Sequence, residues 1–271
     1  MTKFLEILHF EFVQRALISG IFIAVCCAVL GVFLVLRRYS LIGDGLAHVS
    51  FAGVGLGLML GIYPLYVVVV LALLSSWLIL HLSENSEIHG DAAIGLVSSV
   101  GVAGGVLLAS VGEGFNVDLF SYLFGDILTV GKAETYAAIL LSLIVMMVVY
   151  LFYHELFVLS YDEEYAHTLG IQTKRLSRVL LILTAITVVL GIRIVGTMLV
   201  SSLIIFPAVT ALQLAESFGK VILTAAIIAL ISVVLGLCIS IIADLPAGAS
   251  IVMLNFAGFV IAFGIKRIVK G

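Results

Sequence analysis

The sequence predicts an all-α protein, a polytopic transmembrane helical bundle of about nine spans, with eight or ten as the alternatives. Of its 271 residues, 63% are hydrophobic and only 11% are charged, and the mean hydropathy is +1.33. A soluble domain cannot cover its surface with so few charged side chains, so lipid is the solvent for most of the chain. The charges gather between apolar runs, which predicts a single membrane domain over residues 1–271.

Nine apolar runs approach the length of about 20 residues that an α-helix needs to cross the hydrocarbon layer. They cover residues 17–36, 46–61, 64–81, 92–110, 134–153, 178–192, 195–214, 220–243 and 249–266. Several are short or rich in glycine, and a backbone in lipid must have all its polar groups hydrogen-bonded. We therefore expect the short spans to be tilted, broken or buried against their neighbours.

The first 16 residues differ from the runs that follow because they mix charged and apolar side chains. Lys3, Glu6, Glu11 and Arg15 stand among phenylalanines, leucines and isoleucines, which is typical of an amphipathic helix at a membrane interface. No small-residue cleavage pattern follows this segment. We expect residues 1–16 to form a retained, interfacial N-terminal helix.

The distribution of lysine and arginine predicts the orientation, because cytoplasmic segments of membrane proteins are enriched in these residues. With the N-terminus outside and the C-terminus in the cytoplasm, nine of the 13 lysines and arginines lie in cytoplasmic segments. These nine are Arg37, Arg38, Lys174, Arg175, Arg178, Lys220, Lys266, Arg267 and Lys270. An odd number of spans agrees with termini on opposite sides.

The outer connection between residues 112 and 132 is too long for a simple turn, since helix–helix links usually take about 2–8 residues. Its central part is apolar enough to enter the membrane but too short to cross it, so we expect a re-entrant segment or half-helix. Asp118 and Asp126 flank this segment. They either form an acidic vestibule that attracts a cation or act as caps or as partners of Lys132, and the sequence favours neither role.

The inner connection over residues 155–178 predicts one short cytoplasmic helix that lies across the membrane face. A plausible cap at Ser160 precedes an acidic first turn, and Gly170 would end the helix. A helix in this place would let a soluble motor push on the membrane subunit, whereas the alternative is an ordinary surface loop. The residues expected to make this coupling contact are Tyr161, Asp162, Glu163, Glu164, Ala166, Leu169 and Gly170.

Nucleotide chemistry is not expected in this chain. The sequence contains no GxxxxGKS/T motif of the kind that cradles nucleotide phosphates. Any ATP hydrolysis must therefore belong to a separate subunit, and we expect no enzymatic activity from this chain alone.

Asp44 and His48 are the strongest candidates for contact with an ion. They stand four residues apart at the start of an apolar stretch, and on a helix this spacing places both side chains on one face. An ionisable group at membrane depth costs at least about 2.5 kcal/mol on insertion scales, so a close pair of them predicts a cation path. The alternative is structural, with Asp44 as a helix cap and His48 as a buried, hydrogen-bonded side chain.

Gly196 and Pro207 are the candidates for a gate. Proline lacks a backbone donor and kinks or ends a helix, so Pro207 predicts a kink or a half-helix end within the span over 195–214. Gly196 permits a bend at the entry of the same span. A static kink is an equal alternative to a moving gate.

Four ordered motifs carry a resemblance to a known family. They are Leu36 to His48 with Gly53 following, Asp118 to Asp126, Val195 to Ala208, and Asp244 to Ala249. Over essentially the whole length the chain resembles the permease subunits of bacterial metal-ion ABC importers, the zinc/manganese family. Asp44 and His48 match family positions implicated in handling the ion. Ala247 stands where family members often carry a serine.

The resemblance implies a homodimer of permeases in a bacterial cytoplasmic membrane, two copies of a cytoplasmic ABC ATPase subunit, and an extracytoplasmic metal-binding protein as the donor. It implies no permanently bound cofactor, because the metal ion is the transported substrate. The segment Tyr122 to Asp126 is more similar to the zinc branch, so Zn²⁺ is the favoured ion, with Mn²⁺ or Fe²⁺ as the alternative. Membrane lipid is the remaining expected partner, and the net charge of -3 gives no reason to expect nucleic acid.

Two other functions remain open at this point. An intramembrane aspartyl protease would use the carboxylates of Gly43-Asp44 and Gly125-Asp126, but neither pair has the GxGD context of such enzymes. A secondary transporter driven by protons or sodium would need no ATPase, and the lack of visible inverted repeats counts against it.

Overall fold

Nine long and two short helices make up the part of the chain that the structure describes. The computed structural model describes residues 10–85, 88, 90–111, 130–243 and 245–270, and every regular element within these ranges is an α-helix. The helices are α2 (Glu11–Leu36), α3 (Ile42–Leu60), α4 (Pro64–Asn85), α5 (Gly90–Val111), α7 (Lys132–Leu151), α8 (Tyr153–Tyr161), α9 (Glu163–Thr168), α10 (Thr173–Val195), α11 (Thr197–Leu214), α12 (Phe218–Ala243) and α13 (Ala247–Lys270). The all-α prediction is confirmed.

Within the described ranges, nine helices are long and apolar enough to cross a membrane, namely all except α8 and α9. Their number and order agree with the nine predicted spans. The start of α10 differs from the prediction. The helix begins at Thr173, whereas the predicted span begins at residue 178. Its first turns carry Lys174, Arg175 and Arg178. A search for apolar runs excludes such residues, whereas a helix end at the membrane surface tolerates them because their long side chains reach water.

Two predicted segments lie partly or wholly outside the described residues. Of the interfacial helix expected over residues 1–16, residues 10–16 are described. Residues 11–16 form the first turns of α2, continuous with the first span. The re-entrant outer segment, with Asp118 and Asp126, falls within residues 112–129, which the structure does not describe.

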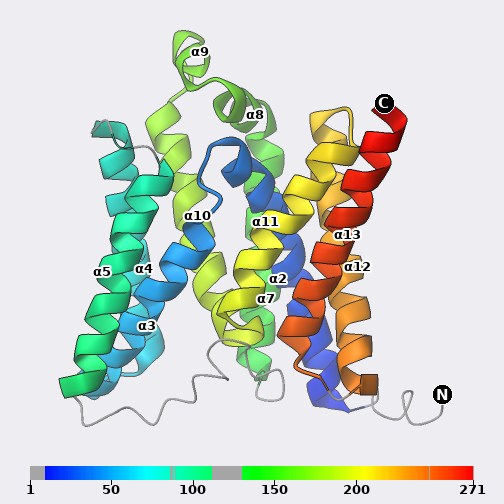
Figure 1. Cartoon of the computed structure of the whole chain (residues 1–271). Helices are drawn as coiled ribbons and strands as arrows, with labels where there is room; N and C mark the ends of the chain where they lie inside the picture. Colours follow the sequence, from blue (N-terminus) through cyan, green and yellow to red (C-terminus); the bar gives the residue numbers. More distant parts are fainter. Residues whose placement is uncertain (1–9, 86–87, 89, 112–129, 244, 271) are drawn as a thin grey trace.

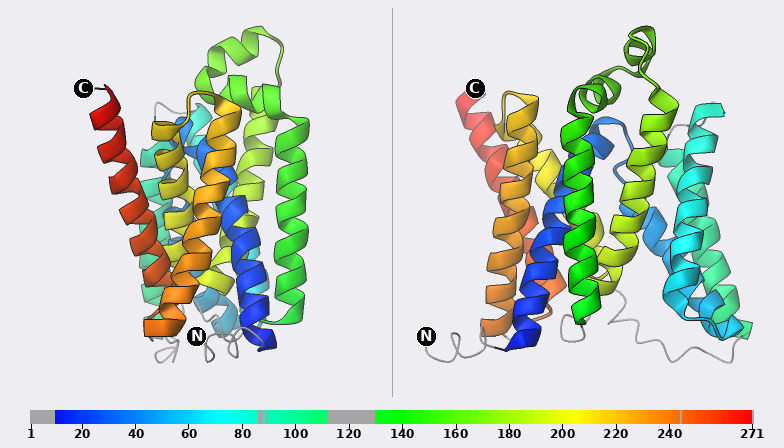
Figure 2. Two further views of the ribbon diagram at one scale, coloured as in Figure 1. Left: turned by 90° about the vertical axis from the view of Figure 1, so that its right-hand side faces the viewer. Right: turned by 180° about the vertical axis from the view of Figure 1, so that it is seen from behind.

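The spanning helices form two groups that meet at α10 (Figure 1). The first group is α3, α4 and α5, which pack on one another, and the second is α11, α12 and α13 together with α2. α10 contacts α3 and α4 of the first group and α2 and α11 of the second, while α7 packs against α2. The view from behind shows the same arrangement (Figure 2, right). The centre of the core is α2, whose Ile23, Phe33 and Leu34 are fully buried.

The backbones of α2 and α11 approach each other closely at Gly31. A Cβ atom added at Gly31 would overlap the carbonyl oxygen of Ile204 and lie 2.9 Å from its carbonyl carbon. Glycine lets the backbones of two membrane helices touch, and this gives them extensive van der Waals contact. The close approach fixes α11 against the core helix.

α8 and α9 lie at the end of the bundle where α13 ends, opposite to the end where α2 begins (Figure 1). The first and last spans therefore begin and end on opposite sides, as an odd number of spans requires. The assignment of the α8–α9 end to the cytoplasm follows from the lysine and arginine distribution and stays a prediction.

The inner connection contains two short helices where one was predicted. α7 ends at Leu151, and α8 follows after a break at Phe152. Asp162 then adopts an extended conformation (φ −152°, ψ 102°), and its carboxylate accepts a hydrogen bond of 2.9 Å from the backbone N–H of Tyr165. The prediction of a cap at Ser160 was wrong because Asp162 ends α8 and caps α9. The acidic first turn agrees with the prediction, and so does the end at Gly170, whose φ is +79°.

Candidate functional site

Asp44 and His48 lie on the same face of the first turns of α3. Nδ1 of His48 is 4.0 Å from Oδ2 of Asp44, as the four-residue spacing predicts. Leu41 occupies the cap position of α3, and no side-chain cap forms there, so the helix cap considered as the alternative role of Asp44 is absent. The Asp44 side chain is 58% exposed and that of His48 is 42% exposed, so both can contact a group outside this chain.

Ser98 of α5 fixes the orientation of the His48 ring. Its Oγ lies 2.6 Å from Nδ1 of His48. When Nδ1 carries the proton, it donates to Ser98 and leaves the lone pair of Nε2 free to bind a cation. α5 comes this close because a glycine faces α3: a Cβ added at Gly101 would lie 2.9 Å from the backbone N of Val49. The alternative role of His48 was that of a buried, hydrogen-bonded side chain. The structure shows the hydrogen bond, but the side chain is not buried.

A tight metal site needs more ligands than this pair provides. Among the residues that the structure describes, no group of three or more histidine, cysteine, aspartate or glutamate side chains could hold a metal ion. Structural zinc sites use four ligands. The geometry of Asp44 and His48 therefore suits either a transient contact or one half of a site that a second molecule completes.

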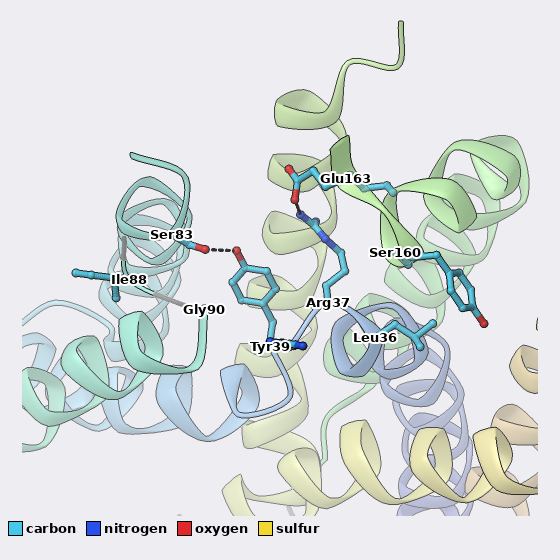
Figure 3. Close-up of a pocket in the computed structure, with 11 residues that line it drawn as sticks. Leu36, Arg37, Tyr39, Ser83, Ile88, Gly90, Ser160 and Glu163 are labelled. Carbon is cyan, nitrogen blue, oxygen red and sulfur yellow. Dashed lines mark hydrogen bonds and ion pairs between the residues drawn. The ribbon is translucent and has the colours of Figure 1, made fainter. Parts of the chain in front are cut away.

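The pair lies near the end of the bundle that carries α8 and α9. α3 begins at Ile42, directly after the turn of residues 37–41. In this turn Nη2 of Arg37 donates to Oε2 of Glu163 in α9 at 3.0 Å. The Tyr39 hydroxyl donates to Oγ of Ser83 in α4 at 2.7 Å, and Figure 3 shows both contacts. The start of α3 is thus tied both to the neighbouring span and to the short helix α9.

Most of the residues predicted for a coupling contact lie on the surface of the α8–α9 region. Tyr161 and Leu169 are 59% and 55% exposed. The other exposed members of the set are Asp162, Glu163, Glu164 and Gly170. Ala166 differs from the others because it is buried on the face of α9 that packs onto the protein. A coupling role for all of these residues stays a prediction.

Gly196 and Pro207 differ in their effect on the backbone. Gly196 separates α10 from α11 and has φ 88° and ψ 163°, a conformation that favours glycine. α11 continues through Pro207 from Thr197 to Leu214, so Pro207 does not end a half-helix. The break lies at Gly196, and a gating role for either residue stays a prediction.

A charged contact that the sequence pattern did not predict joins α7, α10 and the turn between α3 and α4, at the end opposite to α9. Arg193, in the last turn of α10, forms an ion pair through its Nε with Oε1 of Glu134 in the first turn of α7. Its Cζ also lies 5.5 Å from the ring centroid of Tyr63, in the turn between α3 and α4. Oε2 of Glu134 accepts a 3.0 Å hydrogen bond from the backbone N–H of Gly131. The only sequence signal was that Arg193 is a charge beside an apolar run.

Replacing Arg193 or Glu134 with glutamine is expected to lower the stability of the bundle at this end. Both side chains are partly exposed, so solvent screening limits the loss to about 1 kcal/mol. The measurement is the apparent melting temperature in detergent, with Lys132→Gln as the control, since Lys132 is an exposed cation in the same turn of α7. A double variant no less stable than either single variant would support a direct pair, whereas additive losses would contradict it.

The whole chain is similar to known membrane permeases. A family model described as the ABC 3 transport family matches residues 9–266. The manganese import system permease protein ScaB of Streptococcus gordonii is 35% identical over 264 residues, which are 97% of this chain and 95% of ScaB. The high-affinity zinc uptake system membrane protein ZnuB of Haemophilus influenzae is 32% identical over 253 residues, which are 93% of this chain and 97% of ZnuB.

A solved structure of PsaBC from Streptococcus pneumoniae in complex with Fab has a similar fold. Its matching chain aligns with a TM-score of 0.84 and 32% sequence identity, and the alignment covers 97% of this chain and 95% of that one. The arrangement of nine spans described above is therefore similar to that of an experimentally determined protein over nearly its full length.

Proposed function

This chain belongs to the ABC 3 transport family of metal-ion ABC transporter permeases, and from that premise we propose that it imports Zn²⁺ across a bacterial cytoplasmic membrane. ATP hydrolysis on separate subunits drives the import. The observation that carries the proposal is the Asp44–His48 pair, a carboxylate and an imidazole exposed on a membrane-spanning helix. Family membership as a metal-ion permease displaces the protease and secondary-transporter hypotheses.

The exposure of this pair indicates what must cover it. Ionisable side chains that face lipid are unfavourable, by up to about 2.5–3.5 kcal/mol each at the centre of a spanning helix on insertion scales. Asp44 and His48 avoid this cost if they face a second copy of the chain across a water-containing path. Two copies would supply two carboxylates and two imidazoles, which are ligand types and a ligand number that suit Zn²⁺. Sharing the ion between two subunits also allows its release, because conduction needs binding that is not too tight.

The two ends of the bundle have different proposed partners. At the α8–α9 end, the exposed acidic turn of Glu163 and Glu164 with Tyr161 and Leu169 forms a surface for a cytoplasmic ATPase subunit. A dimer of this chain would bind two such subunits. The opposite end would receive the ion from an extracytoplasmic metal-binding protein.

Zinc and manganese are both supported by specific observations. The segment Tyr122 to Asp126 resembles the zinc branch and favours Zn²⁺, whereas the 35% identity to a manganese import permease favours Mn²⁺. Histidine and carboxylate ligands serve both ions, and a donor protein can select the ion before it reaches the permease. Zn²⁺ is therefore proposed as the transported ion and Mn²⁺ as the second candidate.

We expect ATP-dependent metal uptake by proteoliposomes that contain this chain, its ATPase subunit and the metal-loaded binding protein. The measurement is ⁶⁵Zn uptake with and without ATP. It is repeated after Mn²⁺-loaded binding protein is added as a competitor, and the manganese taken up is measured as well. Zinc uptake that needs ATP and resists manganese competition would support the proposal. Uptake of manganese alone would assign the second candidate ion, and uptake that is indifferent to ATP would contradict an ATP-driven importer.

A further inference from the structure

Arg37 connects the short helix α9 to the turn that precedes the candidate ion path. Its Nη2 donates to Oε2 of Glu163 at 3.0 Å, and its side chain is only 5% exposed, whereas that of Glu163 is 49% exposed. Figure 3 shows the Arg37 side chain reaching from the end of α2 to Glu163, at the start of α9. One end of this ion pair is thus fixed in the membrane domain, and the other lies on the surface proposed to face the ATPase.

The surroundings of Arg37 hold its guanidinium group in place. The Cζ atom lies 5.6 Å from the ring centroid of Tyr39, within the range of a cation–π contact. Nη1 is buried without a hydrogen-bond partner. A buried charge that loses its partner is strongly unfavourable, so a movement of Glu163 would draw Arg37 with it rather than leave it behind.

The turn from Arg37 to α3 is short and internally hydrogen-bonded. The backbone N–H of Tyr39 donates to the carbonyl of Leu34 at 2.8 Å, and that of Ile42 donates to the carbonyl of Tyr39 at 3.2 Å. Arg38 has a positive φ of 60°, which is unusual for a residue with a side chain. A turn held in this way passes a displacement on to α3, whose first turn contains Asp44.

An open pocket lies beside the ion pair, so α9 is not packed tightly against this turn. The pocket has a volume of about 480 Å³ and is bordered by Arg37, Arg38, Tyr39, Tyr161 and Glu163, among others. Tightly packed interiors resist displacement, whereas a hollow between two segments lets one move relative to the other. The ion pair crosses this region and provides a direct link between α9 and the turn.

We propose that the Arg37–Glu163 ion pair transmits the movement of α9 to the first turn of α3 and so couples the ATPase cycle to the position of Asp44 and His48. Arg37 and Glu163 are positioning residues in this proposal, because they act through the α2–α3 turn and do not contact the ion. The proposal rests on the proposed function, in which ATP hydrolysis on partner subunits drives uptake.

The test measures ATP hydrolysis and metal uptake in the same proteoliposomes, with the assembled complex of this chain, its ATPase subunit and the zinc-loaded binding protein. For Glu163→Gln we expect continued hydrolysis and a fall of about fivefold or more in ions transported per ATP, the lower end of typical coupling between sites. The exchange of charges in Arg37→Glu/Glu163→Arg should restore part of the ratio. Glu134→Gln, which removes an ion pair at the opposite end, should leave the ratio unchanged.

The outcomes separate this inference from the proposed function. If the wild-type complex shows no ATP-driven uptake, the proposed function fails and the inference falls with it. If the wild type transports but Glu163→Gln keeps the wild-type ratio, only the inference is overturned. Loss of ATPase assembly in Glu163→Gln would show that Glu163 acts in docking alone, and this would also overturn the inference. So would an Arg37→Glu/Glu163→Arg variant that assembles but restores none of the ions transported per ATP.

Discussion

Replacing Asp44 with asparagine, or His48 with glutamine, is expected to reduce ATP-driven metal uptake by at least about tenfold. Each substitution keeps the approximate size of the side chain but removes a carboxylate charge or the Nε2 ligand. Mutation of a residue that only hydrogen-bonds to a metal ligand typically lowers metal affinity or activity by about 10–100-fold. Loss of a ligand itself should therefore lower uptake by at least as much. In a dimer each substitution is present twice at the proposed shared site. Uptake by proteoliposomes that contain equal amounts of assembled complex measures the effect.

Two further variants give this result a clear interpretation. Asp91 is an exposed acidic residue in the first turn of α5, as Asp44 is in the first turn of α3, so Asp91→Asn controls for the loss of a charge. Ser98→Ala removes the 2.6 Å partner of Nδ1 of His48 but leaves both proposed ligands in place, and we expect an intermediate loss. Uptake that survives both Asp44→Asn and His48→Gln would return the pair to a structural role.

The number and order of the spans could be predicted from the sequence because the lipid environment requires long apolar runs. A helix in the hydrocarbon layer needs about 20 apolar residues, and nine runs of this kind correspond to the nine spanning helices among the described residues. The inner connection was harder to predict, since Ser160 and Asp162 are both good caps. The hydrogen bond from Tyr165 to Asp162 decides between them, and only the folded backbone reveals it.

Features of the candidate site that depend on neighbouring residues could also be predicted, whereas contacts between residues distant in the sequence could not. The common face of Asp44 and His48 follows from helix geometry alone. The contact of His48 with Ser98 joins residues 50 positions apart, and that of Arg37 with Glu163 joins residues 126 apart. No periodicity selects one serine or glutamate among many, so such partners follow from how α3, α5 and α9 pack and not from the sequence pattern.

Replacing Gly31 with alanine is expected to destabilise the whole bundle. The new Cβ atom would overlap the carbonyl oxygen of Ile204 and lie 2.9 Å from its carbonyl carbon. Both atoms belong to the backbone of α11, so a change of side-chain rotamer cannot relieve the overlap. α2 and α11 must instead move apart, which should cost about 3 kcal/mol, the upper end of the usual range for overpacking. The measurement is the apparent melting temperature and the yield of monodisperse protein after extraction into detergent.

Gly20→Ala is the matched control, because it adds the same methyl group to the same helix. A Cβ atom at Gly20 would lie 3.5 Å from Cγ1 of Val233, which is an ordinary van der Waals distance. Since alanine is also the better helix former by about 1 kcal/mol, this variant should be at least as stable as the wild type. The difference between the two variants then isolates the backbone contact of α2 with α11 from any general effect of glycine replacement. Equal melting temperatures for Gly31→Ala and Gly20→Ala would show that α11 does not depend on this close approach to hold its place against the core helix.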